Sequence, residues 1–142
     1  MSDKVRAAVV GVGHFGRVHA QKLAKLDGVD LVAVADTDAA RAAQVAAELG
    51  VEAVTSGAAL AGRVDAVGVV VPTRGHFSVA AGFLAAGVHV LVEKPIAADE
   101  ASARSLIALA AGHGAVLQVG HLARFSGVTE ALVRTVNRPL YI

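Results

Sequence analysis

Three glycines and one aspartate near the N-terminus have the types and spacing of a dinucleotide-binding loop. Gly11, Gly13 and Gly16 form a G-x-G-x-x-G pattern, and Asp36 follows 20 residues after the last of them. In such a loop the first glycine allows a tight turn, the second lets the backbone approach a pyrophosphate, and the third lets a helix pack closely on a strand. The free N–H groups at the start of the following helix suit phosphate, and the acid can accept hydrogen bonds from a ribose diol.

The segments around these residues follow the order that the loop requires. An apolar run over residues 5–10 predicts a buried strand before the glycines. A helical pattern follows, with Val18, Leu23 and Leu26 as its apolar positions, and a second apolar run over residues 31–35 leads into Asp36. We therefore expect the whole loop to bind the cofactor: Gly11, Val12, Gly13, His14, Phe15 and Gly16. The alternative is a glycine turn in a strand–helix–strand unit that binds no ligand.

The carboxylate of Asp36 bears on which dinucleotide binds. A 2′-phosphate beside it would be repelled by roughly 2 kcal/mol, about thirtyfold in affinity. Neither Thr37 nor Asp38 supplies a cation that would offset this repulsion. The sequence therefore predicts NAD rather than NADP as the cofactor. In the alternative interpretation, Asp36 caps the next helix.

Strand and helix patterns alternate through the rest of the chain, with short links between them. The later strands are expected over residues 52–55, 66–71, 88–92 and 115–119, and the later helices over residues 37–49, 76–86, 99–111 and 126–136. This alternation predicts an α/β fold built on a doubly wound, parallel, six-stranded sheet of the Rossmann type. Ligands of such sheets bind at the carboxyl ends of the strands, which is where the polar residues discussed below follow the apolar runs.

The composition excludes several classes of protein. The 142 residues are 55% hydrophobic, but no uninterrupted apolar stretch reaches the ~20 residues of a membrane span, so we expect no membrane partner. A net charge of +1 without a basic cluster argues against nucleic acid as a partner. The chain has no cysteine, and its six histidines form no H-x-x-x-H pair, so no metal site is expected. Together with the lack of a signal-peptide pattern, these features predict a cytoplasmic protein.

Four segments of the chain resemble the Gfo/Idh/MocA oxidoreductases: G-V-G-H-F-G-R-V-H-A, V-V-P-T-R-G-H, H-V-L-V-E-K-P and Q-V-G-H-L-A-R-F. The branch that they resemble most contains UDP-N-acetylglucosamine 3-dehydrogenases. The E-K-P after the fifth expected strand is the most specific of these elements. Members of the family oxidise or reduce a sugar, inositol or related hydroxyl with NAD or NADP, so the resemblance implies a sugar or nucleotide-sugar substrate.

The resemblance also assigns roles to the E-K-P segment. Lys94 is the catalytic candidate, because the matching lysine of the family lies near the nicotinamide and the reacting hydroxyl. A cation there can stabilise a developing alkoxide, and it would contact both cofactor and substrate. Glu93 is expected to orient Lys94 or to hold a cofactor ribose. The resemblance further implies a cis peptide bond between Lys94 and Pro95.

Two other strand ends carry expected contacts. Pro72, Thr73 and His76 follow the fourth expected strand and are assigned to the cofactor, although His76 has a helix cap as an equal alternative. His121 and Arg124 follow the sixth expected strand, where the substrate should lie. For these two residues the alternative is an ordinary loop histidine and a surface arginine.

Family members continue into a second α/β domain that supplies most substrate contacts and a catalytic histidine. We therefore expect residues 1–139 to form the dinucleotide-binding domain and residues 140–142 to begin a second domain that is missing here. These 142 residues should then bind NAD with little or no turnover. The alternative is a stand-alone NAD-binding module that acts through self-association or a partner chain. Apolar surface left bare near the sixth strand and the last helix predicts a homo-oligomer.

Overall fold

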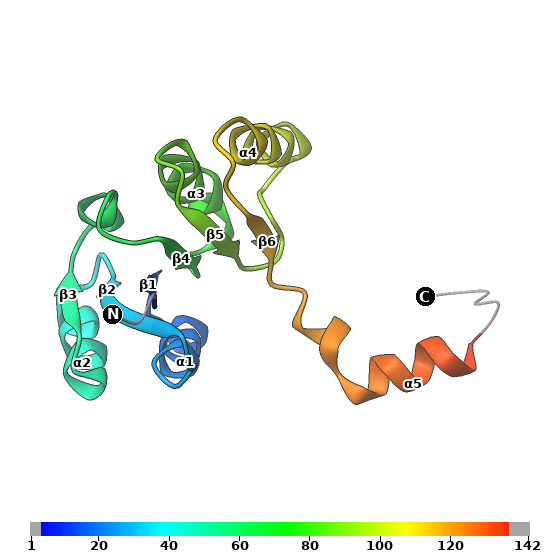
Figure 1. Ribbon diagram of the computed structural model, residues 1–142, viewed down its shortest axis with the longest axis horizontal. Helices are drawn as coiled ribbons and strands as arrows, with labels where there is room; N and C mark the ends of the chain where they lie inside the picture. The colour runs from blue at the N-terminus through cyan, green and yellow to red at the C-terminus, as the bar shows by residue number, and fades with distance from the viewer. Residues whose placement is uncertain (1–3, 137–142) are drawn as a thin grey trace.

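Six short apolar runs form one parallel sheet in the computed structural model, which describes residues 4–136. The strands lie side by side in the order β3-β2-β1-β4-β5-β6 (Figure 1). The strands are β1 (Val5–Val10), β2 (Val29–Ala35), β3 (Glu52–Val54), β4 (Ala66–Val69), β5 (His89–Val92) and β6 (Leu117–Val119). The helices are α1 (His14–Leu23), α2 (Ala39–Leu49), α3 (His76–Ala85), α4 (Glu100–Gly112) and α5 (Gly127–Thr135), with 3-10 turns η1 (Gly57–Leu60), η2 (Thr73–Gly75) and η3 (Leu122–Phe125). The doubly wound Rossmann fold expected from the sequence is confirmed.

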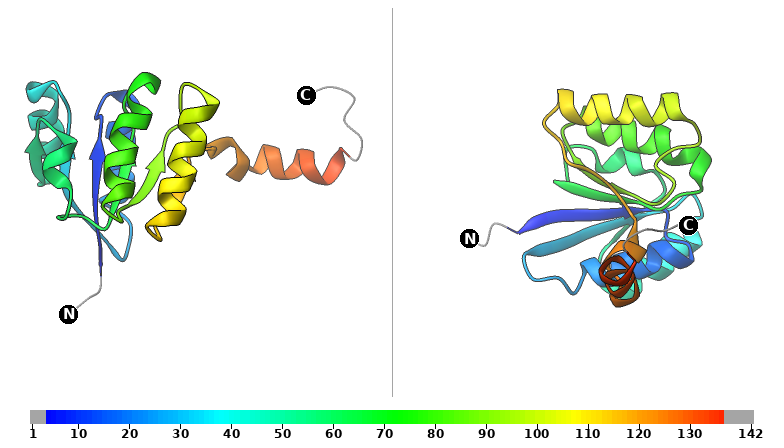
Figure 2. Two further views of the ribbon diagram at one scale, coloured as in Figure 1. Left: turned by 90° about the horizontal axis from the view of Figure 1, so that it is seen from above. Right: turned by 90° about the vertical axis from the view of Figure 1, so that its right-hand side faces the viewer.

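The helices cover the two faces of the sheet in two layers. Helices α1 and α2 pack on one face, and α3 and α4 pack on the other (Figure 2). Each face buries its own apolar cluster, one including Leu60, Leu84 and Leu106, the other including Val9 and Val45. Burial on both faces explains why the strands are continuous apolar runs rather than alternating ones.

The sheet reverses its direction of growth beside β1. From β1 the chain moves outward through β2 to β3, and then returns to the other side of β1 with β4. Strands β1 and β4 therefore send their connections to opposite faces, which leaves a crevice at their carboxyl ends. The fold thus places a ligand site between the loop after β1 and the segment after β4.

Helix α1 is shorter than the sequence pattern predicted. It ends at Leu23, so Leu26 lies beyond it and is exposed, and Val18 is exposed as well. The buried positions of α1 are Gly16 and Ala20, one turn apart. A helix that lies this close to a sheet buries its smallest residues. Of the larger apolar residues in the pattern, Leu23 is partly buried and packs against the core, whereas Val18 and Leu26 were misleading signals.

The helix ends follow the capping rules. The carboxylate of Asp38 accepts a hydrogen bond from the Arg41 N–H at 3.1 Å and so forms the N-cap of α2, and Gly50 ends that helix with a φ of 69°. At the start of α4, the carboxylate of Asp99 accepts hydrogen bonds from the backbone N–H and the hydroxyl of Ser102. These bonds lower the pKa of Asp99, and the backbone bond has the larger effect. These caps satisfy N–H groups that the helices leave without a partner.

An ion pair joins the sheet at the end opposite to the crevice. The carboxylate of Asp65, just before β4, accepts hydrogen bonds from the guanidinium of Arg6 at 2.7 and 3.1 Å and from its backbone N–H at 2.8 Å. These bonds lower the pKa of Asp65 to about 2, and the side-chain bonds from Arg6 have the largest effect. The pair thus aligns the beginnings of β1 and β4.

Helix α5 projects away from the layered body (Figure 1). None of its described residues is buried, and Val128, Leu132 and Val133 expose apolar side chains. Leu122 and Phe125 in η3 are also exposed. The expected domain boundary at residue 139 and residues 140–142, which were expected to begin a second domain, lie outside the described residues.

The core of the fold can be tested at α4. Leu106 is fully buried and Ile107 beside it is 57% exposed. We expect Leu106→Ala to lower the free energy of unfolding by about 2–5 kcal/mol, because it leaves a cavity between α4 and the sheet. The matched change Ile107→Ala should stay within about 0.5 kcal/mol of the parent chain. Urea unfolding followed by circular dichroism measures both, and equal losses would contradict the packing described.

Candidate functional site

The glycine loop brings the start of α1 to the crevice because two of its glycines have no room for a side chain. Gly11 has a φ of +87°, and a Cβ there would lie 2.6 Å from the Val70 carbonyl oxygen. A Cβ on Gly16 would lie 1.7 Å from the Gly11 carbonyl oxygen. Gly13 differs, since within residues 4–136 no heavy atom beyond its chain neighbours lies within 4 Å of its added Cβ. The bare backbone of Gly13 therefore faces open space, as a pyrophosphate subsite needs.

The crevice is large and collects nearly all the residues singled out from the sequence. Its volume is about 1500 Å³, larger than the roughly 300–1,000 Å³ of ordinary small-molecule sites. The residues that line it include Gly11, Gly13, His14, Phe15, Gly16, Asp36, Pro72, Thr73, His76, Glu93, Lys94, His121 and Arg124. They come from the ends of five strands, so the structure brings these residues together where the sheet topology predicted.

Val12 is the exception among the expected contacts. Its side chain is buried in the core between the sheet and α1, and it does not line the crevice. Its backbone N–H donates to Oδ2 of Asp36 at 2.9 Å. The backbone of Val12 therefore holds the carboxylate of Asp36, which lies at the end of the neighbouring strand β2.

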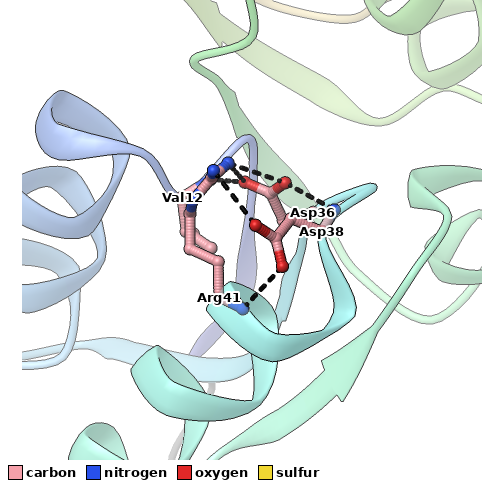
Figure 3. A network of polar contacts seen from close by, with 4 residues as sticks. All are labelled: Val12, Asp36, Asp38 and Arg41. Atoms are coloured by element: carbon pink, nitrogen blue, oxygen red, sulfur yellow. Dashed lines mark hydrogen bonds and ion pairs between the residues drawn. The ribbon is translucent and has the colours of Figure 1, made fainter.

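Asp36 sits at the end of β2 with its carboxylate almost fully occupied. The residue is 7% exposed, and the Asp38 N–H donates to Oδ1 at 2.9 Å. A third donor is the guanidinium of Arg41, whose Nη1 lies 3.2 and 3.3 Å from the two carboxylate oxygens (Figure 3). Asp36 does not cap α2, because Asp38 does. Its position suits a ribose diol, with Arg41 as a neighbour that the sequence reasoning did not include.

Glu93 is fixed by contacts from three sides. Its Oε1 lies 3.0 Å from Nε2 of His19 in α1, and its Oε2 accepts the Lys94 N–H at 3.1 Å. The side chains of His19 and Glu93 are both mostly buried. A Cβ on Gly120, at the end of β6, would lie 2.9 Å from Oε1. Glu93 thus positions the backbone of Lys94 and links α1 to the end of β5.

Lys94 follows β5 on the crevice wall. Lys94 is exposed, and its ammonium group takes part in none of the ion pairs formed within residues 4–136. The Lys94–Pro95 peptide bond is cis, as the resemblance implied. The geometry therefore offers an ammonium group on the crevice wall, on a backbone that Glu93 holds.

His76 is 1% exposed and joins two loops. Its Nδ1 lies 2.7 Å from the Pro95 carbonyl oxygen, and its Nε2 lies 2.9 Å from the Val71 carbonyl oxygen. Both polar atoms of the ring are used to hold the segment after β4 against the segment after β5. The structure thus gives His76 a structural role that neither sequence interpretation named.

The aromatic and basic residues at the rim are more open. His14 and Phe15 have their rings 5.3 Å apart in an edge-on arrangement, and Phe15 is exposed. His121 and Arg124 lie around η3, are exposed, and line the crevice on the side nearest α5. Their side chains are available to a ligand, and residues 4–136 do not enclose them further.

Arg41 and the partner of His19 were not predicted from the sequence, although weak signals existed for both. Arg41 is three residues after the N-cap Asp38, which places it in the first turn of α2 next to Asp36. His19 is three residues after Gly16, on the helix that starts at the crevice. Neither signal reveals the partner of the side chain, because Glu93 follows a distant strand and the turn between β2 and α2 decides that Arg41 reaches Asp36.

The described part of the chain offers neither a metal site nor a membrane span. No group of three or more histidine, cysteine, aspartate or glutamate side chains there is arranged to hold a metal ion. No helix there is long and apolar enough to span a bilayer.

Comparison with known proteins now decides the family. Residues 5–121 match the sequence profile of the Gfo/Idh/MocA group, described as "Oxidoreductase family, NAD-binding Rossmann fold". The chain belongs to the Gfo/Idh/MocA oxidoreductase family. It is 48% identical over 120 residues to the UDP-N-acetylglucosamine 3-dehydrogenase of Acidithiobacillus ferrooxidans, a match that covers 84% of this chain and 38% of that relative.

Solved structures of the family agree with this assignment. The Acidithiobacillus ferrooxidans enzyme superposes with a TM-score of 0.87 at 45% identity, over 92% of this chain and 43% of the other. The scyllo-inositol dehydrogenase of Lactobacillus casei, solved with NAD(H) and scyllo-inositol, superposes with a TM-score of 0.84 at 29% identity, over 92% and 41%. GenD2 from gentamicin A biosynthesis, solved with NAD, reaches 0.88 at 35% identity, over 97% and 40%. This chain therefore spans about two-fifths of the length of these relatives.

The glycine loop can be tested with a matched pair of substitutions. We expect Gly16→Ala to lower the free energy of unfolding by about 1–3 kcal/mol or more, because its Cβ must displace backbone that has nowhere to move. Gly13→Ala should change it by less than about 0.5 kcal/mol, since its Cβ meets open space within residues 4–136. Urea unfolding measures both, and a tolerated Gly16→Ala would show that α1 does not pack as described.

Proposed function

We propose that this chain is the cofactor-binding part of an NAD-dependent oxidoreductase acting on a sugar or nucleotide-sugar hydroxyl. The observation that carries the proposal is the convergence of the glycine loop, Asp36 and Lys94 on one crevice. The relatives support the substrate class, since they include a UDP-N-acetylglucosamine 3-dehydrogenase and a scyllo-inositol dehydrogenase. The cofactor and the substrate would therefore bind at the same edge of the sheet.

The fit to a dinucleotide follows from groups already described. Gly13 leaves its backbone open, and the first turn of α1 offers N–H groups that have no partner within the helix. These groups and the positive end of the helix dipole would bind the pyrophosphate. One strand away, Asp36 would accept hydrogen bonds from the adenosine ribose. The nicotinamide would then lie toward Thr73 and Lys94, on the other side of the switch point.

Lys94 would act on the oxygen of the substrate hydroxyl. The bound cofactor supplies a hydride acceptor or donor at nicotinamide C4. During alcohol oxidation the carbinol C–H bond would break and its hydride would pass to nicotinamide C4, while the O–H proton would leave to a general base and a carbonyl would form. The ammonium of Lys94 would donate a hydrogen bond to that oxygen and stabilise the negative charge that develops on it. Glu93 would keep the Lys94 backbone in place for this role.

The substrate itself would meet only part of its site in this chain. We assign His121 and Arg124 to substrate contacts, because they lie at the rim after β6 and are exposed. The chain spans 38% of the Acidithiobacillus ferrooxidans relative. We place the general base and the remaining contacts in a second domain of the complete protein. Residues 1–142 would therefore bind NAD with little or no turnover.

Calorimetric titration of this chain with NAD tests the proposal. We expect saturable binding with one site per chain, and tighter binding of NAD than of NADP because of Asp36. Gly13→Val should abolish binding, since its side chain would fill the space left for the pyrophosphate, while the fold remains intact.

The control for this titration is the thermal unfolding of Gly13→Val, which should match that of the parent chain. A folded parent chain that binds no NAD would overturn the proposal. Rapid turnover of a nucleotide sugar by residues 1–142 alone would overturn the assignment of the general base to another domain.

The exposed apolar side chains of η3 and α5 favour a second candidate function. Phe125, Val128, Leu132 and Val133 are exposed on neighbouring turns. Contiguous apolar surface of this kind marks an interface. In this second proposal the chain is an NAD-binding module without catalysis that works as a homo-oligomer through this surface.

Sedimentation velocity tests the second candidate. We expect the parent chain to associate as its concentration rises, and the double change Val128→Glu and Leu132→Glu to shift it to monomer, because charge in an apolar interface is costly. Ile107→Glu, an exposed position on α4, is the matched control and should leave association unchanged. A monomeric parent chain at every concentration would argue against the module.

A further inference from the structure

NAD was predicted as the cofactor because no cation was expected beside Asp36. The structure places the guanidinium of Arg41 there. The guanidinium of Arg41 reaches from the first turn of α2 to the carboxylate of Asp36, with its Nη1 3.2 and 3.3 Å from the two oxygens (Figure 3). Its Nη2 lies 3.2 Å from Oδ2 of Asp38. One arginine therefore faces two carboxylates at the place where an adenosine ribose would bind.

The three donors on Asp36 differ in how easily they can move. The N–H groups of Val12 and Asp38 belong to the backbone and are fixed by the glycine loop and the start of α2. The side chain of Arg41 is 47% exposed, so solvent can take over its hydrogen bonds when it turns away. A ribose diol that approaches Asp36 would therefore displace Arg41 and leave the backbone donors in place. The guanidinium would stay within reach of the 2′ position.

A 2′-phosphate at this position would meet both charges. Asp36 repels it, which is the reason to expect a preference for NAD. Arg41 offers a planar guanidinium that can bind phosphate oxygens through two hydrogen bonds, and such charge-assisted pairs are stronger than neutral ones. Because Asp36 is held by backbone donors and Arg41 is not, the arginine can leave the carboxylate for the phosphate.

We infer that Arg41 is a specificity-determining residue that lets the site accept NADP as well as NAD. The inference rests on the proposed dinucleotide function and concerns the same site. Asp36 sets the preference for NAD, and Arg41 reduces that preference by contacting the 2′-phosphate. The site then discriminates less than the roughly thirtyfold expected of an isolated carboxylate.

An alternative role for Arg41 is to stabilise Asp36 and the first turn of α2 without contacting the cofactor. In that case its removal would weaken NAD and NADP equally, or lower the stability of the fold. The ratio of the two dissociation constants separates the roles, because only a contact to the 2′-phosphate changes it.

The experiment is a calorimetric titration of residues 1–142 with NAD and with NADP, for the parent chain, Arg41→Ala and Arg104→Ala. We expect the parent chain to bind NADP no more than about tenfold more weakly than NAD, and Arg41→Ala to weaken NADP by a further tenfold or so. The same variant should change the Kd for NAD by less than about threefold, since the ribose displaces Arg41 in any case. Arg104, paired with Glu100 on the surface of α4, is the matched control and should change neither.

Each other result has a distinct meaning. Equal weakening of both cofactors by Arg41→Ala would overturn the inference and leave the proposed function standing. NAD binding by the parent chain without detectable NADP binding would do the same. A parent chain that binds neither cofactor would overturn both. Thermal unfolding of Arg41→Ala shows whether a loss of binding follows from a loss of fold, and Arg41→Lys in a folded chain should recover part of the NADP affinity because it restores the charge.

Discussion

The contact on which the site depends is the approach of helix α1 to the loop that precedes it. A side chain on Gly16 would collide with the carbonyl oxygen of Gly11, and one on Gly11 would collide with the backbone after β4. The two glycines therefore let β1, α1 and the end of β4 meet at one point. Since α1 begins there, its first N–H groups open into the crevice.

The parallel sheet then delivers the remaining groups to the same edge. Asp36, Glu93 and Gly120 follow three different strands and come from distant parts of the sequence. Parallel strands share the direction of their carboxyl ends, so residues that follow them become neighbours. The hydrogen-bonded pair of His19 and Glu93 ties α1 to β5. This one contact holds α1, which would bind the phosphate, next to the segment after β5 that carries Lys94.

The charges of the crevice are arranged so that the buried ones are satisfied and the exposed ones are free to change partners. Asp36 is nearly buried and has two backbone donors, which is how a carboxylate tolerates burial. Arg41 is half-exposed, and Lys94 is exposed on the wall of the crevice. Fixed acids beside adjustable cations suit a ligand that presents both hydroxyl groups and phosphates.

The sequence by itself determined the order of the elements, the parallel sheet, the glycine loop and the strand ends that carry polar residues. These follow from local rules, because apolar runs and glycine spacing act over a few positions. Only the tertiary structure decided which side chains meet. The pair of His19 and Glu93, the burial of His76 between two loops and the bond from Val12 to Asp36 join segments that follow separate strands. Arg41 and Asp36 are only five residues apart, but the geometry of the turn between β2 and α2 decides that their side chains meet. The apolar positions Val18 and Leu26 misled because the distance between helix and sheet, which only packing sets, decided that Gly16 and Ala20 face inward.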